Sequence, residues 1–125
     1  MKVLLVEDLP LAAKIARFIL AELHCEVDVA INAAEALIKA QSQSYDLIFM
    51  DVGLPGINGI EATALIRKRE ADSGLKRVPI IAITGHGDRE TCIRSGMDDY
   101  LQKPALISDF QKMLNKWLES DPARN

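Results

Sequence analysis

The chain has 125 residues and a formal net charge of −3. That length fits a single domain, and the acidic balance argues against a nucleic-acid-binding surface, which would need a basic stripe. No apolar run approaches the roughly 18 residues of a membrane span, and Glu7 follows the first apolar run too soon for a signal peptide, so we expect a cytoplasmic domain without membrane contact.

The first third of the chain predicts a strand, a helix and a second strand. Residues 2–6 are a β-branched and leucine run that ends in two acids, which indicates a buried strand. Pro10 suits a first helical turn, and we expect the helix to bury the apolar stripe Leu11, Ile15, Ile19 and Leu23. Phe18 falls on the charged side of that helix. It is either a partly covered surface aromatic or a docking contact for a partner. Residues 26–30 alternate in polarity, which is typical of an edge strand.

The middle of the chain contains the most informative strand. Asn32 and Glu35 form a capping box for a helix whose inner face is Ala36, Leu37 and Ala40. The apolar run 47–50 is too short for a helix and precedes a glycine and proline cluster, so we predict a central strand covered on both faces. Asp51 stands at its carboxyl end, where ligands bind in such sheets. A third helix opens at Asn58 or Gly59 and runs through Ile60, Ala64, Leu65 and Arg69.

The last third predicts two more strands and two more helices. An apolar strand at 78–83 leads into Thr84, and a short helix at 89–95 is stopped by a glycine. A fifth strand at 98–102 ends at Lys103. The last helix, capped by Ser108, carries Phe110, Leu114, Trp117 and Leu118. Five strands alternating with five helices predict a parallel α/β sheet with helices on both faces, as one domain of residues 1–120 with a tail at 121–125.

Polar side chains follow four of these strands at what should be one edge of the sheet: Glu7, Asp8, Asp51, Thr84 and Lys103. Three carboxylates in one cleft repel each other, and a hard divalent cation relieves that repulsion. Mg²⁺ accepts carboxylates, a carbonyl and waters, and it tolerates phosphate oxygens. The added lysine and threonine suit a phosphoryl group, for which Asp51 would be the nucleophile and form a mixed anhydride.

Four segments then carry a resemblance to a known family. Val-Glu-Asp at 6–8, Met-Asp-Val-Gly-Leu-Pro-Gly-Ile-Asn-Gly at 50–59, Ile-Ala-Ile-Thr-Gly at 81–85 and Gly-Met-Asp-Asp-Tyr-Leu-Gln-Lys-Pro at 96–104 are similar to the response-regulator receiver domain of two-component signalling. The similarity covers essentially the whole chain. It implies a flavodoxin-like fold with strand order 2-1-3-4-5. The residues of the second and fourth segments look more like those of receivers attached to hybrid histidine kinases than like those of stand-alone regulators.

The resemblance also implies a mechanism and partners. A histidine kinase or histidine phosphotransfer domain would transfer a phosphoryl group from phosphohistidine to the chain, which catalyses its own phosphorylation and dephosphorylation and is a monomer or weak dimer. Mg²⁺ would be held by Asp8, Asp51 and the carbonyl of Gly53, with Glu7 acting through water. The resemblance further implies a cis peptide at Lys103-Pro104, phosphoryl contacts from Thr84 and Lys103, and a switch at Thr84 and Tyr100. We expect the donor to dock on the rim around Asp51 and on the first helix, at Phe18.

Other features limit or compete with that interpretation. Gly53 and His86 occupy positions that the resemblance makes modulators of aspartyl-phosphate lifetime, and we expect His24 and His86 to be non-catalytic. Cys25 and Cys92 lack a C-x-x-C pair or a histidine at ligand spacing, so we expect two reduced, mostly buried thiols.

Two rival functions remain open. An aspartate-nucleophile phosphatase would need a second acid two residues after Asp51, where the chain has glycine. A binding module with the same fold and no phosphorylation is the other rival. A nucleotide-binding site lacks support, because neither G-x-G-x-x-G nor a P-loop follows any strand.

Overall fold

The computed structural model describes residues 1–53, 58–85 and 89–119. Its strands are β1 (Lys2–Val6), β2 (Glu26–Ala30), β3 (Leu47–Asp51), β4 (Ile80–Thr84) and β5 (Asp99–Gln102). Its helices are α1 (Pro10–Glu22), α2 (Ala33–Ser42), α3 (Gly59–Ser73), α4 (Arg89–Arg94), α5 (Ile107–Leu114) and the π-helix η1 (Asn115–Glu119). The expectations for His86, for the glycine and proline cluster at 54–57 and for the tail at 121–125 lie outside the described residues.

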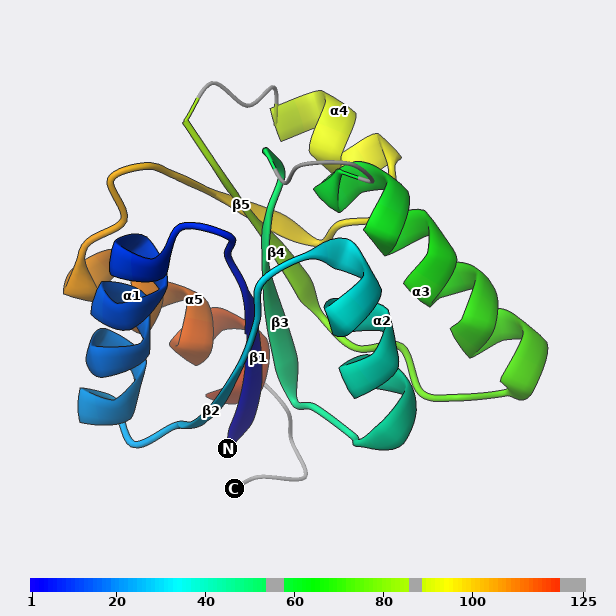
Figure 1. Cartoon of the computed structure of the whole chain (residues 1–125), viewed down its shortest axis with the longest axis horizontal. Helices are drawn as coiled ribbons and strands as arrows, with labels where there is room; N and C mark the ends of the chain where they lie inside the picture. The colour runs from blue at the N-terminus through cyan, green and yellow to red at the C-terminus, as the bar shows by residue number, and fades with distance from the viewer. Residues whose placement is uncertain (54–57, 86–88, 120–125) are drawn as a thin grey trace.

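The five strands form one parallel sheet in the order β2-β1-β3-β4-β5, which confirms the fold class. Figure 1 shows α1 and α5 on one face and α2, α3 and α4 on the other. β2 lies at an edge with mostly half-buried residues, as its alternation predicts. None of the described helices is long and apolar enough to cross a membrane.

The centre of the core is β3, which is buried along its whole length. Successive side chains of a strand point to opposite faces, so β3 contributes to both layers. Leu47 and Phe49 pack in the cluster that holds Phe110 of α5, and the Phe49 and Phe110 rings meet edge to face with centroids 5.1 Å apart. Ile48 and Met50 pack in the opposite cluster with side chains of α2, α3 and α4. The two-sided burial explains why this run shows no polar alternation.

The predicted core stripe of α1 is wrong at two of its four positions. Leu11 and Ile15 are 70% and 53% exposed, while Ile19 and Leu23 are packed against the core. The residues that α1 buries most deeply are Ala13 and Leu20. The helix carries apolar residues on two opposite faces, and the face with alanines is the one that packs on the sheet. Leu11, Ile15 and Phe18 form the exposed α1 apolar face, at the i, i+4 and i+7 spacing of one helical side.

The helix starts agree with the sequence except at the last helix. Asn32 caps α2, with its Oδ1 accepting from the Glu35 amide at 2.8 Å, as predicted. α5 begins two residues earlier than expected, with Leu106 rather than Ser108 at the N-cap position. The acid in the first turn explains this start, because Asp109 Oδ2 accepts a hydrogen bond from the Leu106 amide at 2.8 Å.

Gly59 opens α3 directly against the end of β3. A Cβ atom at this position would lie 2.3 Å from the carbonyl oxygen of Asp51 and 2.9 Å from Cα of Val52, and neither backbone atom can rotate away. We expect Gly59→Ala to lower the free energy of unfolding by about 1–3 kcal/mol, because the first turn of α3 must shift. Urea denaturation measures the change. Gly53→Ala is the control, since its Cβ would meet only Asp51 Oδ1 at an ordinary 3.7 Å, and equal losses in the two variants would contradict the steric explanation.

Candidate functional site

The strand register brings the expected site residues to one edge of the sheet. Val6 of β1 pairs with Met50 of β3, so the acids after β1 stand beside Asp51. β4 and β5 end together, and the amide of Lys103 donates to the carbonyl of Thr84 at 2.8 Å. Side chains far apart in the sequence therefore meet because parallel strands share the direction of their carboxyl ends.

The three acids form a compact cluster. Glu7, Asp8 and Asp51 each place one carboxylate oxygen within 4.8 Å of the other two. Glu7 and Asp51 are buried and Asp8 is half-buried. Opposite ligands of one Mg²⁺ ion lie about 4 Å apart, because each metal–oxygen distance is about 2.1 Å. Small side-chain rotations would therefore let these oxygens share one ion, and the all-oxygen donor set suits a hard divalent cation.

Lys103 links two of these carboxylates. Its ammonium lies 3.2 Å from Asp51 Oδ2 and 3.3 Å from Glu7 Oε1. Burial lowers the pKa of Lys103, but the negative charges of Asp51 and Glu7 raise it by a larger amount. The pKa of Lys103 therefore lies above its ordinary value. Burial, together with the hydrogen bond and the negative charge of Asp51, raises the pKa of Glu7 to about 7. The cluster thus has more negative charge than one lysine offsets, which is the situation that a bound cation relieves.

Backbone amides hold the carboxylates in place. The Gly53 amide donates to Asp51 Oδ1 at 2.9 Å, and the Leu9 amide donates to Glu7 Oε2 at 3.3 Å. The first of these bonds keeps the start of the following loop close to Asp51. This places the backbone of Gly53, whose carbonyl the resemblance makes a metal ligand, in the wall of the cleft.

A cleft of about 590 Å³ opens over the cluster. Asp8, Asp51, Gly53, Thr84 and Lys103 all line it. Two further lining residues, Thr91 and Cys92 of α4, were not predicted as site residues, since a short helix after a loop gives no signal of where its side chains point. The cleft is large enough for a phosphoryl group together with its ligands.

Tyr100, Phe18 and His24 are not among the residues that line the cleft. Tyr100 is half-buried on β5, where it pairs in register with Ala82 of β4. Phe18 is 67% exposed on α1, and His24 follows that helix with φ 67°. The Lys103-Pro104 peptide bond is cis, as expected. Both cysteines are free and buried, as expected.

Comparison with known proteins gives a consistent result. The profile of the response regulator receiver domain family matches residues 3–115. Hybrid signal transduction histidine kinase G of Dictyostelium discoideum is 40% identical over 94% of this chain, and sensor protein GacS of Pseudomonas syringae pv. syringae is 36% identical over 93%. The chain spans only 4% and 13% of the lengths of these two relatives.

Solved structures give the same similarity. One similar structure is the receiver domain of sensor histidine kinase PA1611 from Pseudomonas aeruginosa PAO1, which has magnesium coordinated in its active site cleft. It is 39% identical with a TM-score of 0.84, and the match covers 94% of this chain and 97% of that chain. The receiver domain of the Saccharomyces cerevisiae response regulator Ssk1, solved with the histidine phosphotransfer protein Ypd1, is 31% identical with a TM-score of 0.88, covering 94% of this chain and 88% of that structure.

Proposed function

The chain belongs to the response regulator receiver domain family, and on that premise we propose that it accepts a phosphoryl group on Asp51 from a phosphohistidine donor and then changes conformation to control a partner or attached domain in the cytoplasm. The observation that carries this proposal is the position of Asp51, whose carboxylate lies 3.2 Å from the Lys103 ammonium and has an oxygen within 4.8 Å of oxygens of Glu7 and Asp8. We assign residues 1–120 to the receiver unit, of which the family profile matches 3–115.

The proposed transfer is a direct displacement at phosphorus. A carboxylate oxygen of Asp51 forms the new oxygen–phosphorus bond while the phosphorus–nitrogen bond of the donor histidine breaks and the imidazole leaves with the electron pair. The Lys103 ammonium and the Thr84 hydroxyl contact the phosphoryl oxygens. Asp8, Asp51 and the carbonyl of Gly53 would hold Mg²⁺, with Glu7 acting through water. Bound Mg²⁺ offsets the negative charge of the incoming group.

The donor is proposed to be a histidine kinase or a histidine phosphotransfer domain. The complex of the Ssk1 receiver with Ypd1 supports such a partner, and the hybrid kinase relatives support a receiver attached to a histidine kinase. The α1 apolar face (Leu11, Ile15, Phe18) offers a docking surface, because three large exposed apolar side chains on one helix side are unusual for a free surface. Leu9, which precedes α1, lines the cleft, so this face begins beside Asp51.

We expect Phe18→Ala to slow phosphoryl transfer from a phosphohistidine donor about tenfold, because truncation of a central apolar anchor weakens docking. Labelling by acetyl phosphate needs no docking and should not change. The measurement compares both rates for each variant. Ile38→Ala is the matched control, since Ile38 is similarly exposed but lies on α2, on the other face of the sheet. Equal losses in both assays would exclude a docking role for Phe18.

The proposed switch joins Thr84 to Tyr100. Phosphorylation adds charge at Asp51, Thr84 moves toward the new oxygens, and the loop after β4 follows, which lets the half-buried Tyr100 turn inward. The two conformations must differ by only a few kcal/mol for one modification to change their populations. We expect Tyr100 to be more buried with beryllofluoride and Mg²⁺ than without them, as seen in its ring NMR signals or in paired structures. A single rotamer in both states would refute the switch for this chain.

A further inference from the structure

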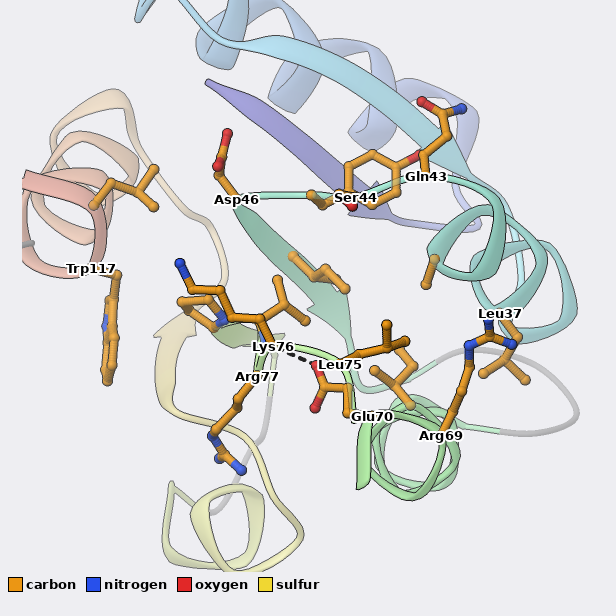
Figure 2. A pocket seen from close by; sticks show the side chains of 17 residues that line it. Leu37, Gln43, Ser44, Asp46, Arg69, Glu70, Leu75, Lys76, Arg77 and Trp117 are labelled. Atoms are coloured by element: carbon orange, nitrogen blue, oxygen red, sulfur yellow. Dashed lines mark hydrogen bonds between the residues drawn. The ribbon is translucent and has the colours of Figure 1, made fainter. Parts of the chain in front are cut away.

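Another cavity lies at the opposite end of the sheet from Asp51 (Figure 2). Asp46 and Pro79, which immediately precede β3 and β4, line it, and so do residues of α2, α3 and η1. Its volume is about 400 Å³, within the roughly 300–1,000 Å³ of small-molecule sites. Its apolar wall is formed by Leu37, Ile48, Ile66, Leu75, Val78 and Leu118.

Three charged groups of the lining are already paired within the fold. Glu70 accepts from Arg67 Nη1 and from the Val78 amide, both at 2.8 Å. Arg77 donates to Asp98 at 2.9 Å, and Figure 2 shows its guanidinium directed away from Asp46 and the centre of the cavity. Asp46 accepts from the Lys2 amide at 2.8 Å. Glu70 and Arg77 therefore add little net charge to the cavity, whereas the bond from the neutral Lys2 amide leaves the negative charge of Asp46 in place.

Two cations of the lining differ from these. Within residues 1–53, 58–85 and 89–119, the side chains of Arg69 and Lys76 make no hydrogen bond or ion pair, and Arg69 Nε is buried without an acceptor. Figure 2 shows the Arg69 guanidinium beside Leu37 on one side of the cavity, and Lys76 extending toward the side of Trp117 on the other. These two cations outnumber the one lining carboxylate outside an ion pair with arginine, Asp46, so the apolar space favours a ligand that is apolar and anionic.

The aromatic residues of the lining are held in fixed orientations. Trp117 Nε1 donates to Asp99 Oδ2 at 2.9 Å, and Lys116 covers one face of the indole ring, with its ammonium 5.6 Å from the ring centroid. The Tyr45 hydroxyl donates to Asp28 at 2.7 Å. Since both polar tips are already bonded, the rings are available to the cavity as apolar surface for a planar ligand.

We propose that this cavity binds a small aromatic carboxylate, whose ring packs among the apolar and aromatic side chains while its carboxylate pairs with Lys76 or Arg69. A carboxylate suits either cation, through a single contact with the ammonium or a two-bond contact with the guanidinium. The site is independent of the Asp51 cleft, because the cavity lies at the other end of β3 and β4. It goes beyond the proposed receiver function, and either proposal can fail without the other.

The test is an NMR titration of the ¹⁵N-labelled chain with 2-naphthoate and, separately, with 2-naphthylmethanol, which has the same ring and no charge. Trp117 is the only tryptophan, so its indole N–H signal is an unambiguous reporter in the cavity wall. We expect 2-naphthoate to shift that signal and the amides of residues 45–48 and 75–78, and to bind about tenfold more tightly than the alcohol. No binding, equal affinities, or shifts confined to the Asp51 cleft or α1 would overturn the proposal.

Charge-removing variants locate the carboxylate. Arg69→Gln or Lys76→Gln should lower 2-naphthoate affinity about tenfold while leaving the alcohol unchanged. Lys68→Gln is the matched control, since Lys68 is exposed on the same helix but does not line the cavity. Ala40→Phe, which narrows the cavity, should weaken both ligands. Unchanged 2-naphthoate affinity in both charge variants would refute the assignment, and acetyl phosphate labelling of each variant tests the receiver function separately.

Discussion

Asp51→Asn is expected to abolish covalent labelling by acetyl phosphate in the presence of Mg²⁺. The wild-type chain should gain one phosphoryl group, seen as a mass increase, and the variant should gain none. The reason is that the amide retains the shape of the side chain but lacks the anionic oxygen that attacks phosphorus. Asp51 is 3% exposed and held by the Gly53 amide at 2.9 Å, so an isosteric change disturbs the fold little.

Controls separate this result from general loss of structure or charge. Asp72→Asn removes one carboxylate from the exposed surface of α3 and should label like the wild type. Removal of Mg²⁺ with EDTA should suppress labelling of the wild type, because three clustered carboxylates would then repel the phosphate. Persistent labelling of Asp51→Asn would assign the phosphoryl group to another residue. Absence of labelling in the wild type, together with unchanged amide signals on adding beryllofluoride, would favour the rival binding module.

The sheet and the composition of its functional edge were predictable because both follow from local pattern and topology. Short apolar runs without alternation indicate buried parallel strands, and the carboxyl ends of such strands meet at one edge. Asp51, Thr84 and Lys103 could therefore be placed together before any coordinates existed. Their roles in phosphorylation and metal binding remain predictions, since geometry alone does not test chemistry.

The wrong predictions concern residues whose burial is decided by tertiary packing rather than by the local sequence pattern. In α1, Leu11 and Ile19 have the same apolar character, and only packing against the sheet distinguishes the exposed residue from the half-buried one. The sequence places Asp99 in the fifth strand and gives no signal of its partners, yet Asp99 is buried and bound by Lys116 and Trp117. Burial raises the pKa of Asp99, but these hydrogen bonds lower it by a larger amount, so the pKa lies below its ordinary value. The partners lie 17 and 18 residues away in sequence, at no fixed spacing that a pattern could detect.

A half-buried acid, Asp98, organises the amino-terminal edge of the sheet. Asp98 Oδ2 accepts from Arg67 Nη2 at 2.6 Å and from the Ile80 amide at 2.8 Å, and Oδ1 accepts from Arg77 Nη2 at 2.9 Å. Arg67 also donates to the carbonyls of Gly96 at 2.8 Å and Val78 at 2.7 Å. One carboxylate and one guanidinium thus tie α3 to the starts of β4 and β5, and both side chains are largely buried.

We expect Asp98→Ala to lower the free energy of unfolding by about 2–4 kcal/mol, since it removes one of the two carboxylates that pair with Arg67 and leaves the Ile80 amide without its acceptor. Arg77→Ala removes the other arginine that pairs with Asp98. Because the Arg77 side chain is 58% exposed, this change should alter the free energy of unfolding by less than about 1 kcal/mol. Urea denaturation of the two variants measures the contrast. If Asp98→Ala lost no more stability than Arg77→Ala, the Asp98 carboxylate would not stabilise this junction, and α3, β4 and β5 would have to be held by the other bonds of Arg67 and by apolar contacts.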